Sequence, residues 1–150
     1  TSALAVSAIN ASIVSEGAVL DAGIGSSLFE VRAGAHLRLE GITLANGRAN
    51  NLVSGGAVSV LSASVEMVGC AVVNSSAAYG GAVAVVNGRL EMKDSTIEDS
   101  AAEQNGGALF VSGESVVVLR RSSIVGSVAQ GSGGAVAISG GSVTVANSSI

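Results

Sequence analysis

A short glycine motif recurs along this 150-residue chain at almost constant spacing. A pair of glycines followed by Ala and an aliphatic residue occurs four times, and successive copies are 25, 26 and 27 residues apart. The pairs are Gly55-Gly56, Gly80-Gly81, Gly106-Gly107 and Gly133-Gly134. A period of this length is typical of a solenoid, in which one short supersecondary unit stacks on the next. We expect the glycines to form corners where φ is positive or where neighbouring coils approach closely.

The residues after each glycine pair indicate strands. An apolar-x-apolar step follows the motif, then a turn rich in Ser, Gly and Asn, and then a second apolar-x-apolar step. A third apolar position lies five residues farther on. Alternation with period 2 is typical of strands, and the segments are too short for ordinary helices. The columns predicted to face inward are Phe29, Val58, Val83, Leu109 and Val136; Val31, Val60, Val85, Val111 and Ile138; Leu37, Val65, Leu90, Val117 and Val143; and Leu39, Met67, Met92, Leu119 and Val145.

These patterns predict an all-β fold, a right-handed parallel β-helix of about five coils of 25–28 residues. The predicted repeats are 28–54, 55–79, 80–105, 106–132 and 133–150. Residues 1–27 are expected to form an irregular partial coil, with a strand at 4–6 and a surface loop at 16–24. The composition of 48% hydrophobic and 2% aromatic residues fits a thin core of small aliphatic side chains. Because solenoids normally carry caps, we expect a fragment of a longer solenoid.

The repeat also resembles a known family. A Gly-Gly-Ala-aliphatic motif, a strand, a Ser/Gly turn and a second strand occur together over residues 28–150, most clearly over 106–150. This arrangement resembles the repeats of chlamydial polymorphic outer-membrane proteins, and it is similar to β-helix repeats in large bacterial and algal surface proteins. The resemblance implies an exported surface protein, often an adhesin or a passenger domain, and it identifies no ligand.

Three Asn-x-Ser sequons mark possible glycosylation sites, at Asn10, Asn74 and Asn147. Glycosylation at these residues requires a eukaryotic secretory route. The alternative is that asparagine recurs at the turns of the solenoid, where it tolerates the left-handed backbone conformation and stacks in ladders.

The outward positions of the first strand define a possible interaction patch. These positions are Glu30, Ser59, Ala84, Phe110 and Ala137. The stripe becomes apolar toward its C-terminal end, which predicts that Ala84, Phe110 and Ala137 pack against another chain or segment. The alternative is an isolated exposed aromatic residue, which is common on protein surfaces.

The densest group of charges spans residues 93–103 and contains Lys93, Asp94, Glu98, Asp99 and Glu103. A cation or sugar site needs carboxylates that converge from neighbouring coils, and the aligned positions supply almost none. We therefore favour a solvated acidic turn with an ion pair between Asp94 and Arg121 across two coils.

The sequence predicts no catalytic, cofactor-binding or metal-binding residues. The single cysteine, Cys70, is expected to be a small buried side chain, and the single histidine, His36, lies about one coil away from it. A net charge of −4 argues against nucleic acid as a partner. No run of 18 apolar residues is present, so no membrane-spanning helix and no direct membrane insertion are expected.

Together these features predict a non-enzymatic, extracellular segment of a large surface or filament protein. It is expected to act as a rigid spacer and an interaction surface. The expected partners are a protein or a glycan at the cell surface, or further copies in a larger filament. The alternative is the scaffold of a carbohydrate-active β-helix enzyme, similar to a polysaccharide lyase or hydrolase, with its active site outside this segment.

Overall fold

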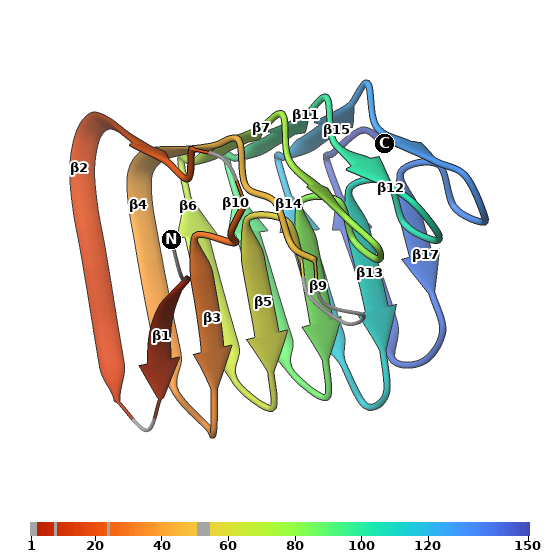
Figure 1. The fold of residues 1–150 in the computed structure, drawn as a ribbon. Coiled ribbons are helices and arrows are strands. Elements are labelled where there is room, and N and C mark those ends of the chain that lie inside the picture. The colour runs from red at the N-terminus through yellow and green to blue at the C-terminus, as the bar shows by residue number, and fades with distance from the viewer. Residues whose placement is uncertain (1–2, 8, 24, 51–54) are drawn as a thin grey trace.

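The chain winds into a stack of coils that forms a parallel β-helix (Figure 1). The computed structural model describes residues 3–7, 9–23, 25–50 and 55–150. Within these residues the regular elements are all β-strands, and every pairing between them is parallel. The predicted all-β solenoid of about five coils is confirmed over the described part of the chain.

Among the described residues, the strands form three sheets. The first sheet contains β1 (Leu4–Ser7), β3 (Phe29–Arg32), β5 (Val58–Leu61), β9 (Val83–Val86), β13 (Leu109–Ser112) and β17 (Val136–Ile138). The second contains β2 (Asn10–Asp21), β4 (His36–Ala45), β6 (Ser64–Val68), β10 (Arg89–Lys93), β14 (Val116–Arg120) and β18 (Ser142–Ala146), together with β7 (Ala71–Val73), β11 (Thr96–Glu98) and β15 (Ser123–Val125). The third contains β8 (Ser76–Ala77), β12 (Ala101–Ala102) and β16 (Val128–Ala129). This third sheet was not predicted.

The strand register places like residues above one another. Phe29 pairs with Val58, and the same column continues through Val83 to Leu109 and Val136. The other three predicted columns are also in register. Their side chains in the central coils are buried together in one hydrophobic core. Aliphatic residues with period 2 therefore fill the interior, as predicted.

The second sheet bends along each coil. The long strand β4 pairs with both β6 and β7, whereas later coils divide the same path into two strands. The division falls at Gly69, Asp94 and Arg121, whose φ angles are +58°, 51° and 46°. These left-handed residues turn the chain by one corner and keep the neighbouring coils in register.

The N-terminal region is more regular than predicted. The expected strand at 4–6 is confirmed as β1, which pairs with β3. The expected loop is wrong for residues 16–21, because β2 continues to Asp21 and pairs with β4. A register shift between Val14 and Ala18 absorbs the extra residues, as a β-bulge does. Ile24, the last residue of the expected loop, lies outside the described residues.

The repeated glycines serve both purposes expected of them. Gly80, Gly106 and Gly133 have φ angles of +60°, +69° and +67°. A Cβ atom on the second glycine of a pair, as at Gly81 or Gly107, would collide with the backbone oxygen of the equivalent glycine in the next coil. The motif is therefore required by backbone packing between coils.

Candidate functional site

The outer corner of the second sheet carries an acidic, a basic and an amide side chain in one column. Asp94, Arg121 and Asn147 occupy this corner in three successive coils, with left-handed φ angles of 51°, 46° and 51°. All three side chains are exposed. Gly69 occupies the same position one coil earlier, so the column carries functional groups only toward the C-terminal coils.

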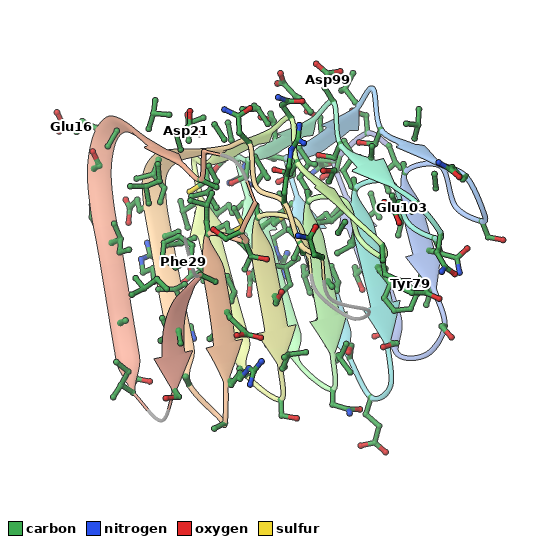
Figure 2. The ribbon with its side chains drawn as sticks, in the orientation of Figure 1. Glu16, Asp21, Phe29, Tyr79, Asp99 and Glu103 are labelled. Atoms are coloured by element: carbon green, nitrogen blue, oxygen red, sulfur yellow. The ribbon has the colours of Figure 1, made fainter. Side chains whose placement is uncertain are left out.

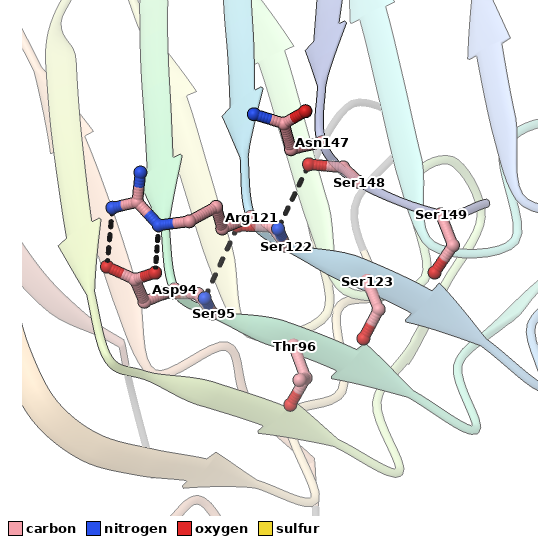
Figure 3. A pocket seen from close by; sticks show the side chains of 9 residues that line it. All are labelled: Asp94, Ser95, Thr96, Arg121, Ser122, Ser123, Asn147, Ser148 and Ser149. Carbon is pink, nitrogen blue, oxygen red and sulfur yellow. Dashed lines mark hydrogen bonds and ion pairs between the residues drawn. The ribbon is translucent and has the colours of Figure 1, made fainter.

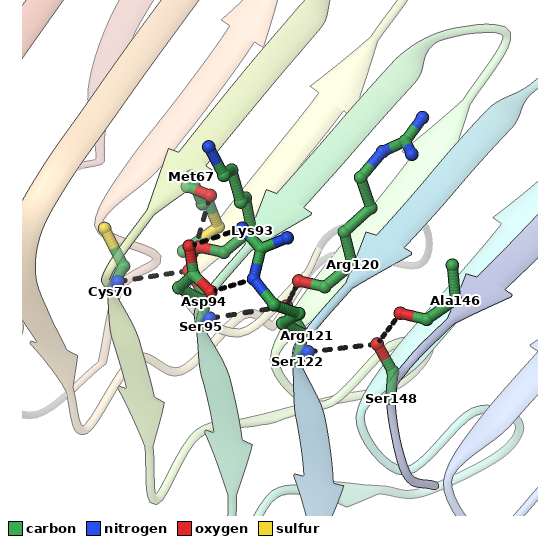
Figure 4. A network of polar contacts seen from close by, with 10 residues as sticks. All are labelled: Met67, Cys70, Lys93, Asp94, Ser95, Arg120, Arg121, Ser122, Ala146 and Ser148. Atoms are coloured by element: carbon green, nitrogen blue, oxygen red, sulfur yellow. Dashed lines mark hydrogen bonds and ion pairs between the residues drawn. The ribbon is translucent and has the colours of Figure 1, made fainter.

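A ladder of serines lies behind this corner (Figure 4). The hydroxyls of Ser95, Ser122 and Ser148 each accept a hydrogen bond from a backbone N–H of the preceding coil. These donors are Cys70 at 3.1 Å, Ser95 at 3.3 Å and Ser122 at 3.0 Å. Each hydroxyl also donates to the carbonyl two residues before it, at 2.8–2.9 Å. The serines thus satisfy backbone groups that the corner removes from the sheet ladder.

Cys70 continues this serine column toward the N-terminus. Its side chain is buried, as predicted, and its thiol donates to the carbonyls of Leu39 and Val68 at 3.4 Å. His36 instead lies against Ser64, with 2.8 Å between Nδ1 and Oγ. The Cys70 thiol is therefore buried and hydrogen-bonded to backbone carbonyls, as is expected of a residue with a structural role.

The predicted ion pair between coils is confirmed. Arg121 binds Asp94 through two hydrogen bonds, from Nε at 2.6 Å and from a terminal guanidinium nitrogen at 3.0 Å. These bonds lower the pKa of the Asp94 carboxyl from its ordinary value, and they raise the pKa of Arg121. Both side chains are about half exposed, at 46% and 52%, so the pair is open to solvent and to salt.

Beside the corner lies an open groove of about 630 Å³ (Figure 3). Its outer row consists of Thr96, Ser123 and Ser149, which stand in register on neighbouring coils. Asp94 and Arg121 form one border of the groove. We call this feature the hydroxyl groove. It offers hydrogen-bond donors and acceptors at regular intervals along the axis of the solenoid.

The remaining acids of the predicted charge cluster do not converge. Asp99 lies at the top edge of the molecule in the view of Figure 2, whereas Glu103 lies lower on the right. Glu98 faces outward on β11. Among the described residues no three His, Cys, Asp or Glu side chains could hold a metal ion together.

The three sequons lie in different settings. Asn74 has a φ of 51° and donates through Nδ2 to Oδ1 of Asn46 at 2.6 Å, and Asn46 donates in turn to Asp21 at 3.0 Å. The predicted asparagine ladder is therefore confirmed at Asn74. Asn147 is exposed in the hydroxyl groove, and Asn10 is exposed at the start of β2. Glycosylation of the three residues stays a prediction.

The outward stripe of the first sheet is not an exposed patch. Ala84 is fully buried, and Phe110 is 9% exposed because its ring lies 4.9 Å from that of Tyr79. Tyr79 also donates a hydrogen bond to Gln104 at 2.8 Å. The alternative of an isolated exposed aromatic residue is thus wrong for Phe110, which packs against another segment of the same chain, and Ala137 is half-buried. Packing of this stripe against another chain stays a prediction.

The physical reason is that the chain at Tyr79 and Gly80 folds back over this face, close to the backbone of Phe110. The first glycine of an earlier pair also lies on this face: Gly55 donates its N–H to the hydroxyl of Ser59 at 3.0 Å, and a Cβ atom on it would collide with the backbone of Ala84. An aromatic residue immediately before a glycine pair, Tyr79 before Gly80, was the available signal for this cover in the sequence.

Comparison of the chain with protein-family models, curated proteins and solved structures gave no match. No helix of the described residues is long and apolar enough to cross a membrane. The interpretation of the site therefore rests on the residues of this chain.

Proposed function

We propose that this chain is a structural or adhesive segment of a large extracellular surface or filament protein. It acts as a rigid spacer and presents an interaction surface along its length. The observation that carries this proposal is the continuity of the ladders: β1, β3, β5, β9, β13 and β17 pair in one unbroken series. At about 4.8 Å per strand, the five steps of this series span about 24 Å.

Side-chain contacts reinforce the backbone ladders. Val31, Val60 and Val85 stack in the interior with no exposed surface. On the outside, Arg38 of β4 forms an ion pair with Glu66 of β6 at 2.5 Å. Because each coil contacts only its neighbours, length grows coil by coil while the cross-section stays constant. These properties support a spacer, and the exposed polar face of the second sheet supports an adhesive role toward a protein or glycan.

A deletion of one coil tests the spacer. Residues 80–105 form one complete repeat, and their removal joins Tyr79 to Gly106, which is equivalent to Gly80. Spin labels at Ser12→Cys and Thr144→Cys, in a Cys70→Ser background, lie in one outward column of the second sheet. We expect double electron–electron resonance to show a label distance shorter by about 4.8 Å and a distribution of the same width.

The matched control removes residues 80–92, which deletes β9 and most of β10. The strands of the next coil then have no complete coil with which to pair. This variant is expected to lose its cooperative unfolding transition. A broad distance distribution in the one-coil deletion, or a length that does not change, would contradict the spacer.

A further inference from the structure

Two cations stand side by side on the strands that end one residue before Asp94 and Arg121, the border of the hydroxyl groove. Lys93 and Arg120 are the last residues of β10 and β14, where they pair in register, and both are exposed. Figure 4 shows their side chains extending to the same side of the sheet. Like charges on neighbouring strands repel each other, so this pairing does not stabilise the sheet.

The carboxylates nearby compensate these charges incompletely. Among the described residues, no carboxylate lies within ion-pairing distance of Lys93. Glu91 lies 3.7 Å from Nε of Arg120 and is shared with Arg89 at 3.4 Å. The strand ends beside the groove are therefore locally cationic on a chain whose net charge is −4.

Cations and hydroxyls lie on the two sides of one corner. The chain passes from Lys93 through Asp94 and Ser95 to the outward hydroxyl of Thr96, and the next coil repeats the path from Arg120 to Ser123. Both rows therefore recur along the axis at about 4.8 Å. A long ligand that lies parallel to the axis meets a positive edge and a hydroxyl row at the same time.

We propose that the hydroxyl groove binds an acidic polysaccharide. Its carboxylate or sulfate groups lie against Lys93 and Arg120, and its hydroxyls exchange hydrogen bonds with Thr96 and Ser123. Asp94 limits the affinity because it holds the guanidinium of Arg121 in an ion pair. The proposal rests on the proposed function, for which it names the class of glycan and the surface.

The positions of the aromatic side chains argue against a single-stranded nucleic acid as the ligand. Single-stranded nucleic acids are bound through aromatic rings on which bases stack. In this chain Tyr79 and Phe110 pack on each other over the first sheet, and Phe29 is buried in the core. The groove presents hydroxyl, amide and charged groups instead.

Titration calorimetry with dextran sulfate, and with unmodified dextran as the neutral probe, tests the proposal. We expect the protein to bind dextran sulfate, with an affinity that falls as salt is added, and to leave dextran unbound. The double substitution Lys93→Gln and Arg120→Gln is expected to weaken binding by roughly ten-fold or more. Asp94→Asn is expected to strengthen binding, because it frees Arg121 and removes a negative charge.

Arg32→Gln is the matched control. Arg32 is likewise an exposed arginine at the end of a strand, but it lies on β3 of the first sheet, where it pairs with Glu30. We expect its affinity for dextran sulfate to equal that of the unchanged protein. Thermal unfolding of each variant verifies that it is folded before binding is compared.

Three results would overturn the proposal: equal binding of dextran and dextran sulfate, an equal loss of affinity in Arg32→Gln, or binding of poly(U) as tight as that of dextran sulfate. None of these results changes the label distances in the one-coil deletion. Failure of the polysaccharide site and failure of the spacer are therefore distinguished.

Discussion

At the scale of single residues, the serine ladder links neighbouring coils through side chains. Ser95 accepts the backbone N–H of Cys70 in a position closed to solvent. Ser95→Ala leaves that donor without a partner, and we expect a loss of about 1–3 kcal/mol in the free energy of unfolding, measured by denaturant titration. Ser142→Ala, at an exposed position on β18, is the control and is expected to change stability by less than about 0.5 kcal/mol. Equal effects of the two substitutions would contradict the ladder.

Cys70 provides the converse test, because it stands where later coils have serine. Cys70→Ser places a hydroxyl within reach of the carbonyls that the thiol already contacts. We expect unfolding free energy to change by less than about 1 kcal/mol. Ile97→Ser introduces the same side chain into a fully buried column of the hydrophobic core, and a loss above about 3 kcal/mol is expected. A large loss in Cys70→Ser would show that the column does not accommodate a hydroxyl.

The ion pair at the corner predicts a specific titration. Hydrogen bonds from Arg121 lower the pKa of Asp94. In Arg121→Gln we expect the carboxyl pKa, followed by carbon-detected NMR, to rise toward its ordinary value of 3.8. The stabilisation from the pair is present above the ordinary pKa and disappears as the pH falls through the lowered one, so the two proteins converge in stability in strong acid. An unchanged Asp94 pKa in the variant would refute the assignment.

At the scale of elements, the second glycines of two pairs differ in how closely other backbone atoms approach them. A methyl group at Gly107 collides with backbone atoms of the next coil, whereas one at Gly134 meets nothing closer than a carbonyl oxygen 3.9 Å away. Neither residue has a positive φ. Gly107→Ala is therefore expected to reduce the midpoint of thermal unfolding strongly, by more than about 10 °C, and Gly134→Ala to leave it nearly unchanged. Similar midpoints for the two variants would show that coil spacing does not require glycine.

The strands that were predictable are those in which the repeat itself sets the register. Equivalent residues such as Met67 and Met92 lie one period apart, and the period-2 alternation predicts which side chains face the core. The pair between Asp94 and Arg121 was predictable for the same reason. The short strands of the third sheet were missed because two residues, such as Ser76–Ala77, carry no periodicity.

Features that depend on contacts across the chain were not predicted from the repeat pattern. The cover of Phe110 by Tyr79 arises from a segment one coil earlier that folds back over the first sheet. The continuation of β2 past Ser15 depends on pairing with β4, because a bulge around Gly17 looks like a loop in sequence. The groove is formed by hydroxyl residues on separate coils, and no single one of these residues marks a groove in the sequence.

At the scale of the whole molecule, the core is closed in the middle and open toward both described ends. Leu90, Met92 and Leu109 have no exposed surface. By contrast, Leu4 of β1 is 57% exposed and Ile138 of β17 is 54% exposed, although both continue the columns of the first sheet. A coil with neighbours on both sides therefore buries far more apolar surface than one with a neighbour on a single side.

This gradient predicts how the molecule opens. In a solenoid the stability of a coil is the sum of its intrinsic stability and of its interfaces with the neighbouring coils. A terminal coil has one such interface fewer, so it opens at a lower free energy than a central coil. Hydrogen exchange followed by mass spectrometry is expected to show the slowest amides in β6 and β10 and faster exchange in β17 and β18. Gly107→Ala, which disturbs the interface between the coil of β13 and the coil of β17, is expected to speed exchange in β13 and β17 more than in β3. Uniform exchange along the chain, with one common rate for all strands, would instead indicate that the coils unfold together as a single cooperative unit.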